Sequence, residues 1–268
     1  MLIHFKTSDG NPPKKPPTPI NQKSFDMSCK IGSWNVRGLL AYSKRQSVKA
    51  RCLEWELDAV CLQEIHGTEA NSYCWKQQLG FSLARFSHFE SNARGAAVLV
   101  NTPDNPDFVS RADAHGRLSA LQFRAAGKNL IVISVYAPNV SRAVEARNVY
   151  NNFVQLLDDW LAWARNVPNV DGVLLMGDLN ICLGPNDFDG PVPDHPDQCR
   201  DYLEEVLADH ELVDIERALV NPDGIIYTYS RQNTYRRLDY AFLSADLLDI
   251  VTGVSKKHCS LSDHSALV

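Results

Sequence analysis

The chain has no hydrophobic run long enough to cross a membrane, and no apolar signal segment opens its 268 residues. We therefore expect no membrane partner. Its seven cysteines are an odd number and include no Cys-x-x-Cys pair. This pattern argues against a disulfide framework and is typical of reduced core thiols in an intracellular protein.

Positive charge is also scarce. The chain has 27 Lys and Arg against 32 Asp and Glu, which gives a formal net charge of -5 and a pI near 5.9. A domain that binds nucleic acid usually carries a basic face. If DNA is the substrate, its phosphates must be contacted by locally placed positive charge.

The N-terminal segment differs in composition from the remainder. Residues 1–28 include a cluster of prolines from Pro12 to Pro19, with Lys14 and Lys15 among them. We expect this segment to be disordered or extended, since it cannot build a core. Its two lysines favour a solvated leader over an electrostatic tail or import signal, because only two basic residues are present. With 44% hydrophobic residues in the chain, residues 29–268 are expected to form one folded domain.

The rest of the chain alternates between strand and helix patterns. Strands are predicted at residues 31–36, 59–62, 96–100, 118–123, 130–135, 173–176, 227–229, 238–243 and 250–255. Apolar residues recur at helical spacing at Val48, Cys52 and Trp55, and again at Val149, Phe153, Leu156, Trp160 and Trp163. Each stripe predicts a helix with one buried face, so these tryptophans are expected in the core rather than as base-stacking platforms. The pattern indicates an α/β fold with many strands.

Polar side chains follow the ends of several predicted strands. The most informative is Gly177-Asp178-Leu179-Asn180, which ends an apolar run without alternation and therefore a strand buried on both faces. The others are Asn35, Glu64, Tyr136, Asn139, Asp239, Asp263 and His264. Buried carboxylates without partners are costly, so side chains of this kind that converge must share a task. Oxygen and amide ligands without cysteine favour a hard cation such as Mg²⁺ or Mn²⁺ over zinc.

Six motifs in this order resemble those of the endonuclease/exonuclease/phosphatase superfamily. They are Trp34-Asn35, Gln63-Glu64, Tyr136-Ala137-Pro138-Asn139, Gly177-Asp178-Leu179-Asn180, Arg237-Leu238-Asp239-Tyr240 and Ser262-Asp263-His264. Within the superfamily the chain resembles exonuclease III-like nucleases. It is most similar to the apurinic-type endonuclease domains of LINE (non-LTR) retrotransposons, whose sequences resemble residues 91–98 and 262–267 of this chain. The resemblance implies a four-layer α/β sandwich, with two mixed β-sheets packed face to face and helices on the outside.

The resemblance also implies roles for individual residues. It assigns catalytic roles to Asp178, Asn180, His264, Asp239 and Tyr136, metal binding to Glu64, Asn35 and Asp263, and phosphate binding to Asn139. Arg142, three residues after Asn139, is a further candidate for phosphate contact. Asp178 would orient or deprotonate the attacking water, and His264, oriented by Asp239, would donate to the phosphate. The cofactor would be Mg²⁺, with Mn²⁺ as an alternative, and which carboxylate acts as base stays open. The other histidines, including His195, are expected at the surface or in packing.

Two places bear on the choice of substrate. Arg37 stands where many abasic-site repair enzymes have an acidic or amide residue, which places repair activity in doubt. The segment Ser230 to Arg236 reads as a polar hairpin tip, and its Arg231, Tyr235 and Arg236 suit contact with a DNA groove. In LINE endonucleases the matching hairpin helps to select the target site. A solvated turn is the alternative interpretation.

These features predict a metal-dependent, monomeric nuclear endonuclease. It would nick duplex DNA to leave a 3′-hydroxyl that primes reverse transcription at the target site, with a reverse transcriptase domain downstream in the same polyprotein. Two alternatives stay open, namely an abasic-site repair endonuclease and a phosphatase or phosphodiesterase acting on inositol phosphates or lipid head groups. A catalytically inactive binding module is disfavoured, because every expected catalytic residue type is present.

Overall fold

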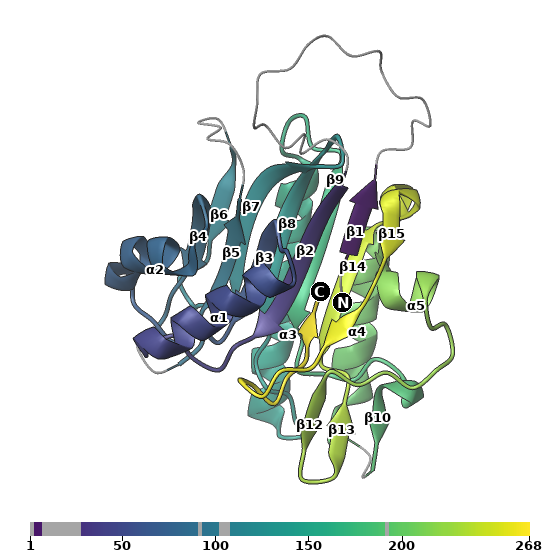
Figure 1. Cartoon of the computed structure of the whole chain (residues 1–268). Coiled ribbons are helices and arrows are strands. Elements are labelled where there is room, and N and C mark those ends of the chain that lie inside the picture. Colours follow the sequence, from purple (N-terminus) through teal and green to yellow (C-terminus); the bar gives the residue numbers. More distant parts are fainter. Residues whose placement is uncertain (1–2, 7–27, 91–92, 102–107, 191–192) are drawn as a thin grey trace, which may run out of the picture.

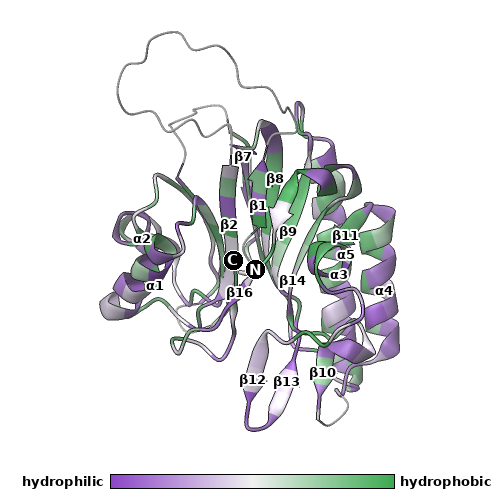
Figure 2. Ribbon diagram, turned by 45° about the vertical axis from the view of Figure 1, so that its right-hand side comes forward, coloured by the Kyte–Doolittle hydropathy of each residue, from purple (hydrophilic) through white to green (hydrophobic). Residues whose placement is uncertain are grey.

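Two mixed β-sheets pack face to face, with helices on both outer surfaces (Figure 1). The computed structural model describes residues 3–6, 28–90, 93–101, 108–190 and 193–268. Helices α1 (Tyr42–Glu54) and α2 (Ser72–Leu79) cover one sheet, and α3 (Val144–Arg165) and α4 (Asp197–Asp209) cover the other (Figure 2). The predicted four-layer sandwich is therefore confirmed. Among the helices in the described ranges, none combines the length and the apolar character needed to cross a membrane.

The first sheet has the strand order β15-β1-β2-β3-β5-β4, with β17 pairing with both β2 and β16. Its strands are β1 (Ile3–Lys6), β2 (Ser28–Asn35), β3 (Ala59–Gln63), β4 (Leu83–Ser87), β5 (Ala96–Val100), β15 (Val251–Gly253), β16 (Lys256–Lys257) and β17 (Ala266–Leu267). Strands β2 and β3 run parallel, and the other pairs are antiparallel. The carboxyl ends of β2 and β3 therefore meet at one edge of the sheet.

The second sheet has the order β11-β14-β9-β8-β7-β6, and β8 and β9 are its parallel pair. Its strands are β6 (Ser110–Ala112), β7 (Leu118–Ala125), β8 (Lys128–Tyr136), β9 (Gly172–Asp178), β11 (Leu212–Asp214) and β14 (Asp239–Ser244). A small third sheet, β10-β13-β12, is formed by β10 (Phe188–Asp189), β12 (Tyr229–Arg231) and β13 (Thr234–Arg236). The short helix α5 (Ile215–Leu219) and the 3₁₀ turns η1 (Glu69–Asn71), η2 (Pro185–Asp187) and η3 (Ala245–Ile250) complete the described elements.

Alternation along the strands fills three cores. On β8, Leu130 and Val132 pack between the two sheets, whereas Ile131 and Ile133 pack under α3 and α4. The other outer core lies between the first sheet and helices α1 and α2. Because the central strands are covered on both faces, their sequences are continuously apolar, as the sequence pattern indicated.

The folded domain includes part of the segment that we expected to lie outside it. Strand β1 pairs with β2, and its Ile3 and Phe5 are fully buried in the central core. The assignment of residues 1–28 to a disordered segment is therefore wrong for residues 3–6. The proline cluster with Lys14 and Lys15 lies outside the described residues.

The buried stripe of α3 also differs from the prediction. Trp160 is buried, but Val149 is exposed, and Leu156 and Trp163 lie at the edge of the core. The core face is instead built from Tyr150, Phe153, Val154, Leu157, Trp160, Leu161 and Ala164. This stripe lies one residue further along the chain than most of the predicted one, because a spacing of three or four residues fits two adjacent helical phases over a short window.

Candidate functional site

Sheet register brings the predicted polar side chains together. Asn35 ends β2, and Glu64 follows β3, which runs parallel to β2. In the second sheet, Asp178 at the end of β9 pairs directly with Tyr136 on one side and with Asp239 on the other. Side chains from distant parts of the chain thus meet where the strands of both sheets end.

The backbone at the end of β9 requires glycine. Gly177 has a φ of +148°, and a Cβ there would lie 2.0 Å from the carbonyl oxygen of Val135. Beyond it, the backbone N–H of Asn180 donates to Asp178 Oδ1 at 2.9 Å, and the Asn180 amide donates to the carbonyl of Ala137 at 2.8 Å. The Gly-Asp-x-Asn motif therefore turns the chain sharply and fixes the orientation of the Asp178 carboxylate.

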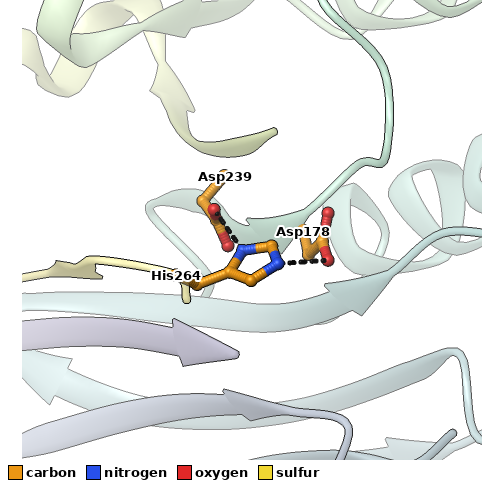
Figure 3. Close-up of side chains that lie close together, drawn as sticks. All are labelled: Asp178, Asp239 and His264. Atoms are coloured by element: carbon orange, nitrogen blue, oxygen red, sulfur yellow. Dashed lines mark hydrogen bonds and ion pairs between the residues drawn. The ribbon is translucent and has the colours of Figure 1, made fainter. Parts of the chain in front are cut away.

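His264 lies between two buried carboxylates (Figure 3). Its Nδ1 is hydrogen-bonded to Asp239 Oδ2 at 2.8 Å, and its Nε2 lies 3.9 Å from Asp178 Oδ2. Asp178 and Asp239 are each 1% exposed and His264 is 5% exposed. The Asp239 carboxylate therefore orients the imidazole so that Nε2 faces Asp178.

Contacts with the backbone hold this dyad of Asp239 and His264 in place. Trp34 Nε1 donates to the carbonyl of His264 at 3.2 Å, and Tyr229 forms an isolated β-bridge with His264. The hydroxyl of Thr228, which is buried, accepts hydrogen bonds from the backbone N–H groups of Leu238 and Asp239, both at 3.0 Å. The site thus connects the start of β14 to the base of the hairpin formed by β12 and β13.

Burial sets the protonation states of the central pair. Burial raises the pKa of Asp178 to about 7, and the charge of Asp239 adds to this rise while His264 opposes it. Burial alone would lower the pKa of His264, but the charge and hydrogen bond of Asp239, followed by the charges of Asp178 and Asp263, raise it to about 10. At neutral pH the imidazole is therefore a cation, and Asp178 is close to its midpoint, as a general base requires.

Glu64 and Asp178 are joined through one amide. Asn35 Nδ2 donates to Glu64 Oε1 at 2.8 Å and to Asp178 Oδ2 at 2.9 Å. Burial would raise the pKa of Glu64, but hydrogen bonds from His66 and Asn35 outweigh it and lower the pKa to about 2. Glu64 is thus a carboxylate at every working pH, as a ligand for a divalent ion must be.

A cavity of about 340 Å³ opens over Glu64 and His264. Its lining includes many of the predicted residues, namely Glu64, Tyr136, Asn139, Asn180, Arg231, Arg236, Asp263 and His264. Arg117 stacks over the Tyr136 ring at 5.0 Å. Burial, followed by the charges of Glu64 and Asp178, raises the pKa of Tyr136, so its phenol stays protonated and can donate to a phosphate oxygen.

The donor set fits a hard divalent cation. Carboxylate oxygens predominate, and the Oδ1 atoms of Asp239 and Asp263 are buried without a hydrogen-bond partner in the described structure. Ligand atoms of Asp178, Asp239 and His264 also lie within 4.8 Å of one another, but a protonated His264 has no lone pair to offer a metal. Asp263, which we expected to bind metal, forms an ion pair with Arg37 through its other oxygen.

The predicted DNA-contacting residues lie on the hairpin and on one exposed loop. Arg231, Tyr235 and Arg236 were expected at a turn, but they lie on strands β12 and β13. The tip consists of Gln232 and Asn233, whose positive φ angles of 47° and 61° close a two-residue turn. Tyr235 is 40% exposed, as a side chain that reaches toward a ligand would be.

Arg142, on the exposed loop before α3, is an exposed side chain that pairs with Asp194. The distance between Arg142 Nε and Asp194 Oδ1 is 3.0 Å. The loop is adjacent to Asn139, which lines the cavity. Arg142 is thus placed beside the site rather than in it.

Two side chains in or next to the site were not predicted from the sequence. His195 lines the cavity, although we expected a surface or packing role for it. Arg237, only 1% exposed, pairs with Asp214 through two contacts of 2.7 Å, and this anchors the chain just before the strand that carries Asp239. A histidine in an irregular loop carries no periodic signal, so sequence alone could not have placed His195.

Known proteins share this architecture and these motifs. The AP endonuclease LMAP from Leishmania major superposes with a TM-score of 0.73 at 18% identity, covering 89% of this chain and 86% of that one. An AP endonuclease from Archaeoglobus fulgidus superposes with a TM-score of 0.71 at 20% identity, covering 89% and 97%. At these identities the likeness establishes the fold.

Relatives by sequence are larger proteins for the most part. They include the 149 kDa protein of transposon TX1 from Xenopus laevis, 24% identical over 77% of this chain and 15% of that protein. Recombination repair protein 1 of Drosophila melanogaster is 25% identical over 89% of this chain and 36% of its own length, and an exodeoxyribonuclease of Bacillus subtilis is 26% identical over 60% and 62%. The chain therefore spans less than two thirds of each of these relatives.

The family model covers nearly the whole described domain. It matches residues 32–264, from the buried strand β2 to His264. All six motifs noted in the sequence lie within or at the edge of this range, which confirms the predicted superfamily. The chain belongs to the endonuclease/exonuclease/phosphatase family.

Proposed function

We propose that this protein is a divalent-metal-dependent endonuclease that hydrolyses a phosphodiester bond in duplex DNA and leaves a 3′-hydroxyl nick. The observation that carries the proposal is a cationic imidazole that lines the cavity, with the buried Asp178 carboxylate of raised pKa behind it and Glu64 linked to that carboxylate through Asn35. This arrangement supplies the base and the positive charge that ester hydrolysis at phosphorus needs.

The residues of the chain divide the reaction between them. Asp178, with its orientation fixed by Asn180, accepts a proton from the water that attacks phosphorus. The P–O3′ bond breaks as the water oxygen bonds to phosphorus. The leaving 3′ oxygen takes a proton from solvent and becomes a hydroxyl, and the phosphate remains on the 5′ side of the downstream nucleotide. His264 donates from Nε2 to a phosphate oxygen, while Asp239 keeps the imidazole charged.

A divalent ion would be held by Glu64, with Asn35 and Asp178 as the neighbouring groups. When bound, such an ion supplies positive charge that offsets the charge developing on the phosphate and leaving oxygens. Mg²⁺ fits this oxygen-rich set, and Mn²⁺ is the alternative. Asp263 is the weaker ligand candidate, since Arg37 already neutralises it.

We further propose a biological setting from the transposon relative. A nick with a 3′-hydroxyl would prime reverse transcription at the target, in the nucleus, by a monomeric domain followed by a reverse transcriptase in the same polyprotein. The hairpin of β12 and β13 supports target selection, because it extends from the cavity and carries exposed Arg231 and Tyr235. Arg37, which stands where many abasic-site repair enzymes have an acidic or amide residue and which here pairs with Asp263, disfavours abasic-site repair.

The test uses supercoiled plasmid incubated with purified protein and Mg²⁺. The proposal expects nicked circles, loss of nicking in EDTA, and nicks that a DNA polymerase extends directly because they end in 3′-hydroxyls. A duplex with one abasic analogue is compared with the intact duplex, and an inositol phosphate is offered in parallel. Strong preference for the lesion would favour the repair enzyme, and turnover of the small ester without nicking would favour the phosphatase.

A further inference from the structure

Three nitrogen-bearing side chains from the hairpin and from the loop before α4 line the cavity and have no part in the proposed hydrolysis. His195 comes from the loop before α4, and Arg231 and Arg236 come from strands β12 and β13 of the hairpin. All three line the same cavity as Glu64 and His264. The cavity therefore contains a second group of donors beside the catalytic one.

The His195 imidazole is held as a neutral donor. Its Nδ1 accepts a hydrogen bond from the backbone N–H of Cys182 at 3.1 Å, so the ring proton is on Nε2. Burial, followed by the positive charge of Arg236, lowers the pKa of His195 to about 4, although the nearby Asp194 acts in the opposite direction. At neutral pH the ring thus offers one N–H and no charge.

Arg236 presents a guanidinium with an unused donor. Its Nη1 is buried and has no hydrogen-bond partner within the described part of the chain. The guanidinium lies 5.8 Å from the ring centre of Phe188, and its charge acts on both Cys182 and His195. A buried N–H without an acceptor is costly, and a ligand oxygen would remove that cost.

We propose that His195 and Arg236 form a second phosphate subsite. This subsite binds a phosphate that flanks the scissile phosphate in the backbone of the same DNA strand. Each side chain has only N–H donors left to offer a ligand, so the complementary group is an acceptor, and the charge of Arg236 selects an anion. The cavity of about 340 Å³ has room for more than one phosphate group. Contacts to two phosphates of one strand, the scissile and the flanking one, fix the position of the scissile ester over Asp178. This inference rests on the proposed nuclease function.

The test scans a duplex that contains one nicking site with single methylphosphonates, which remove the charge of one phosphate at a time. In the wild type, substitution at one flanking position should slow nicking by about tenfold, the size expected for a lost charge-assisted hydrogen bond. In Arg236→Gln the same substitution should have little further effect, because the contact is already absent. His195→Asn should show a smaller loss at the same position.

Arg165→Gln is the matched control. Arg165 lies beside Gly172 at the start of β9, whereas the site lies at the end of that strand, so this variant should keep the wild-type scan. A scan in Arg236→Gln that equals the wild-type scan, or a wild-type scan without a sensitive flanking position, would overturn the subsite.

Binding separates this inference from the proposed chemistry. Fluorescence anisotropy in EDTA measures affinity without cleavage, and Arg236→Gln should lower the slope of log affinity against log salt by about one. Wild-type protein that binds DNA but never nicks it would contradict the proposed function. The change in salt slope in Arg236→Gln would then still show whether the subsite exists. Failure to bind DNA would overturn both.

Discussion

The buried cluster of Asp178, Asp239 and His264 and the hairpin beside it are built by different means. Asp178 and Asp239 are fixed by the register of a six-stranded sheet, and each residue of the cluster is at most 5% exposed. The hairpin belongs to a sheet of two- and three-residue strands, and its Tyr235 is 40% exposed. A bridge between Tyr229 and His264 joins the two regions.

This difference separates the residues that carry out the chemistry from those that select the DNA site. The cluster cannot change without disturbing the core, whereas the hairpin can vary at its tip while its base stays attached. We therefore expect substitutions in the cluster to lower the rate at every DNA site. Substitutions at the hairpin tip should instead redistribute nicking among sites.

The largest effect is expected for His264→Ala. Loss of the imidazole removes a positioned donor and a positive charge, so single-turnover nicking with Mg²⁺ should fall by about 10²- to 10⁴-fold. His258→Ala, which changes an exposed histidine outside the cluster, is the control and should retain the wild-type rate. Equal rates for His264→Ala and wild type would remove His264 from the chemistry.

A large loss of stability is expected for Arg237→Ala. Arg237 is buried against Asp214, and removing one partner of a buried pair leaves the other uncompensated, at a cost of about 3–5 kcal/mol in the free energy of unfolding. Arg165→Ala removes an exposed pair with Glu211 and should cost about 1 kcal/mol or less. Urea denaturation measures both. Similar urea midpoints for the two variants would show that the Arg237–Asp214 pair does not anchor the chain before β14.

A clear change in titration is expected for Asp239→Asn. In the wild type the pKa of His264 is raised to about 10 by Asp239, so the metal-free imidazole stays protonated as pH rises through neutrality. Without that carboxylate the raising influence is lost, and the ring should titrate within about pH 5–8 or below. Histidine resonances in NMR spectra report this directly. An unchanged titration would mean that Asp239 does not control the imidazole charge.

The smallest effect on rate is expected at the hairpin. Arg231→Ala should change the distribution of nick sites on a plasmid library and lower the salt slope of binding by about one, while the rate at retained sites stays near wild type. Sequencing of nicked ends gives the map. A uniform fall in rate with an unchanged map would show that the hairpin serves the chemistry rather than the choice of site.

Much of the site could be predicted because strand ends carry a local signal. Asp178, Asn35 and Tyr136 follow apolar runs, and parallel or paired strands bring such ends together. The core strands were predicted for the same reason, since residues buried on both faces leave uninterrupted apolar sequence.

The remainder depends on contacts that sequence does not encode locally. Strand β1 is separated from β2 by a long segment, and strands of two or three residues such as β10 and β13 are too short to show alternation. The pairing of Arg37 with Asp263 joins residues far apart in the chain, and the orientation of His195 depends on one backbone N–H. Each is visible only after the sheets have packed.

The most direct test of the account is the single-turnover nicking rate of Asp178→Asn, with Mg²⁺ saturating and DNA binding measured on the same preparation. The substitution keeps the shape of the side chain and removes its ability to accept a proton. We predict wild-type affinity for DNA and a loss of nicking of at least about 10²-fold at every site. Nicking at the wild-type rate by this variant would contradict the assignment of the buried cluster as the catalytic centre.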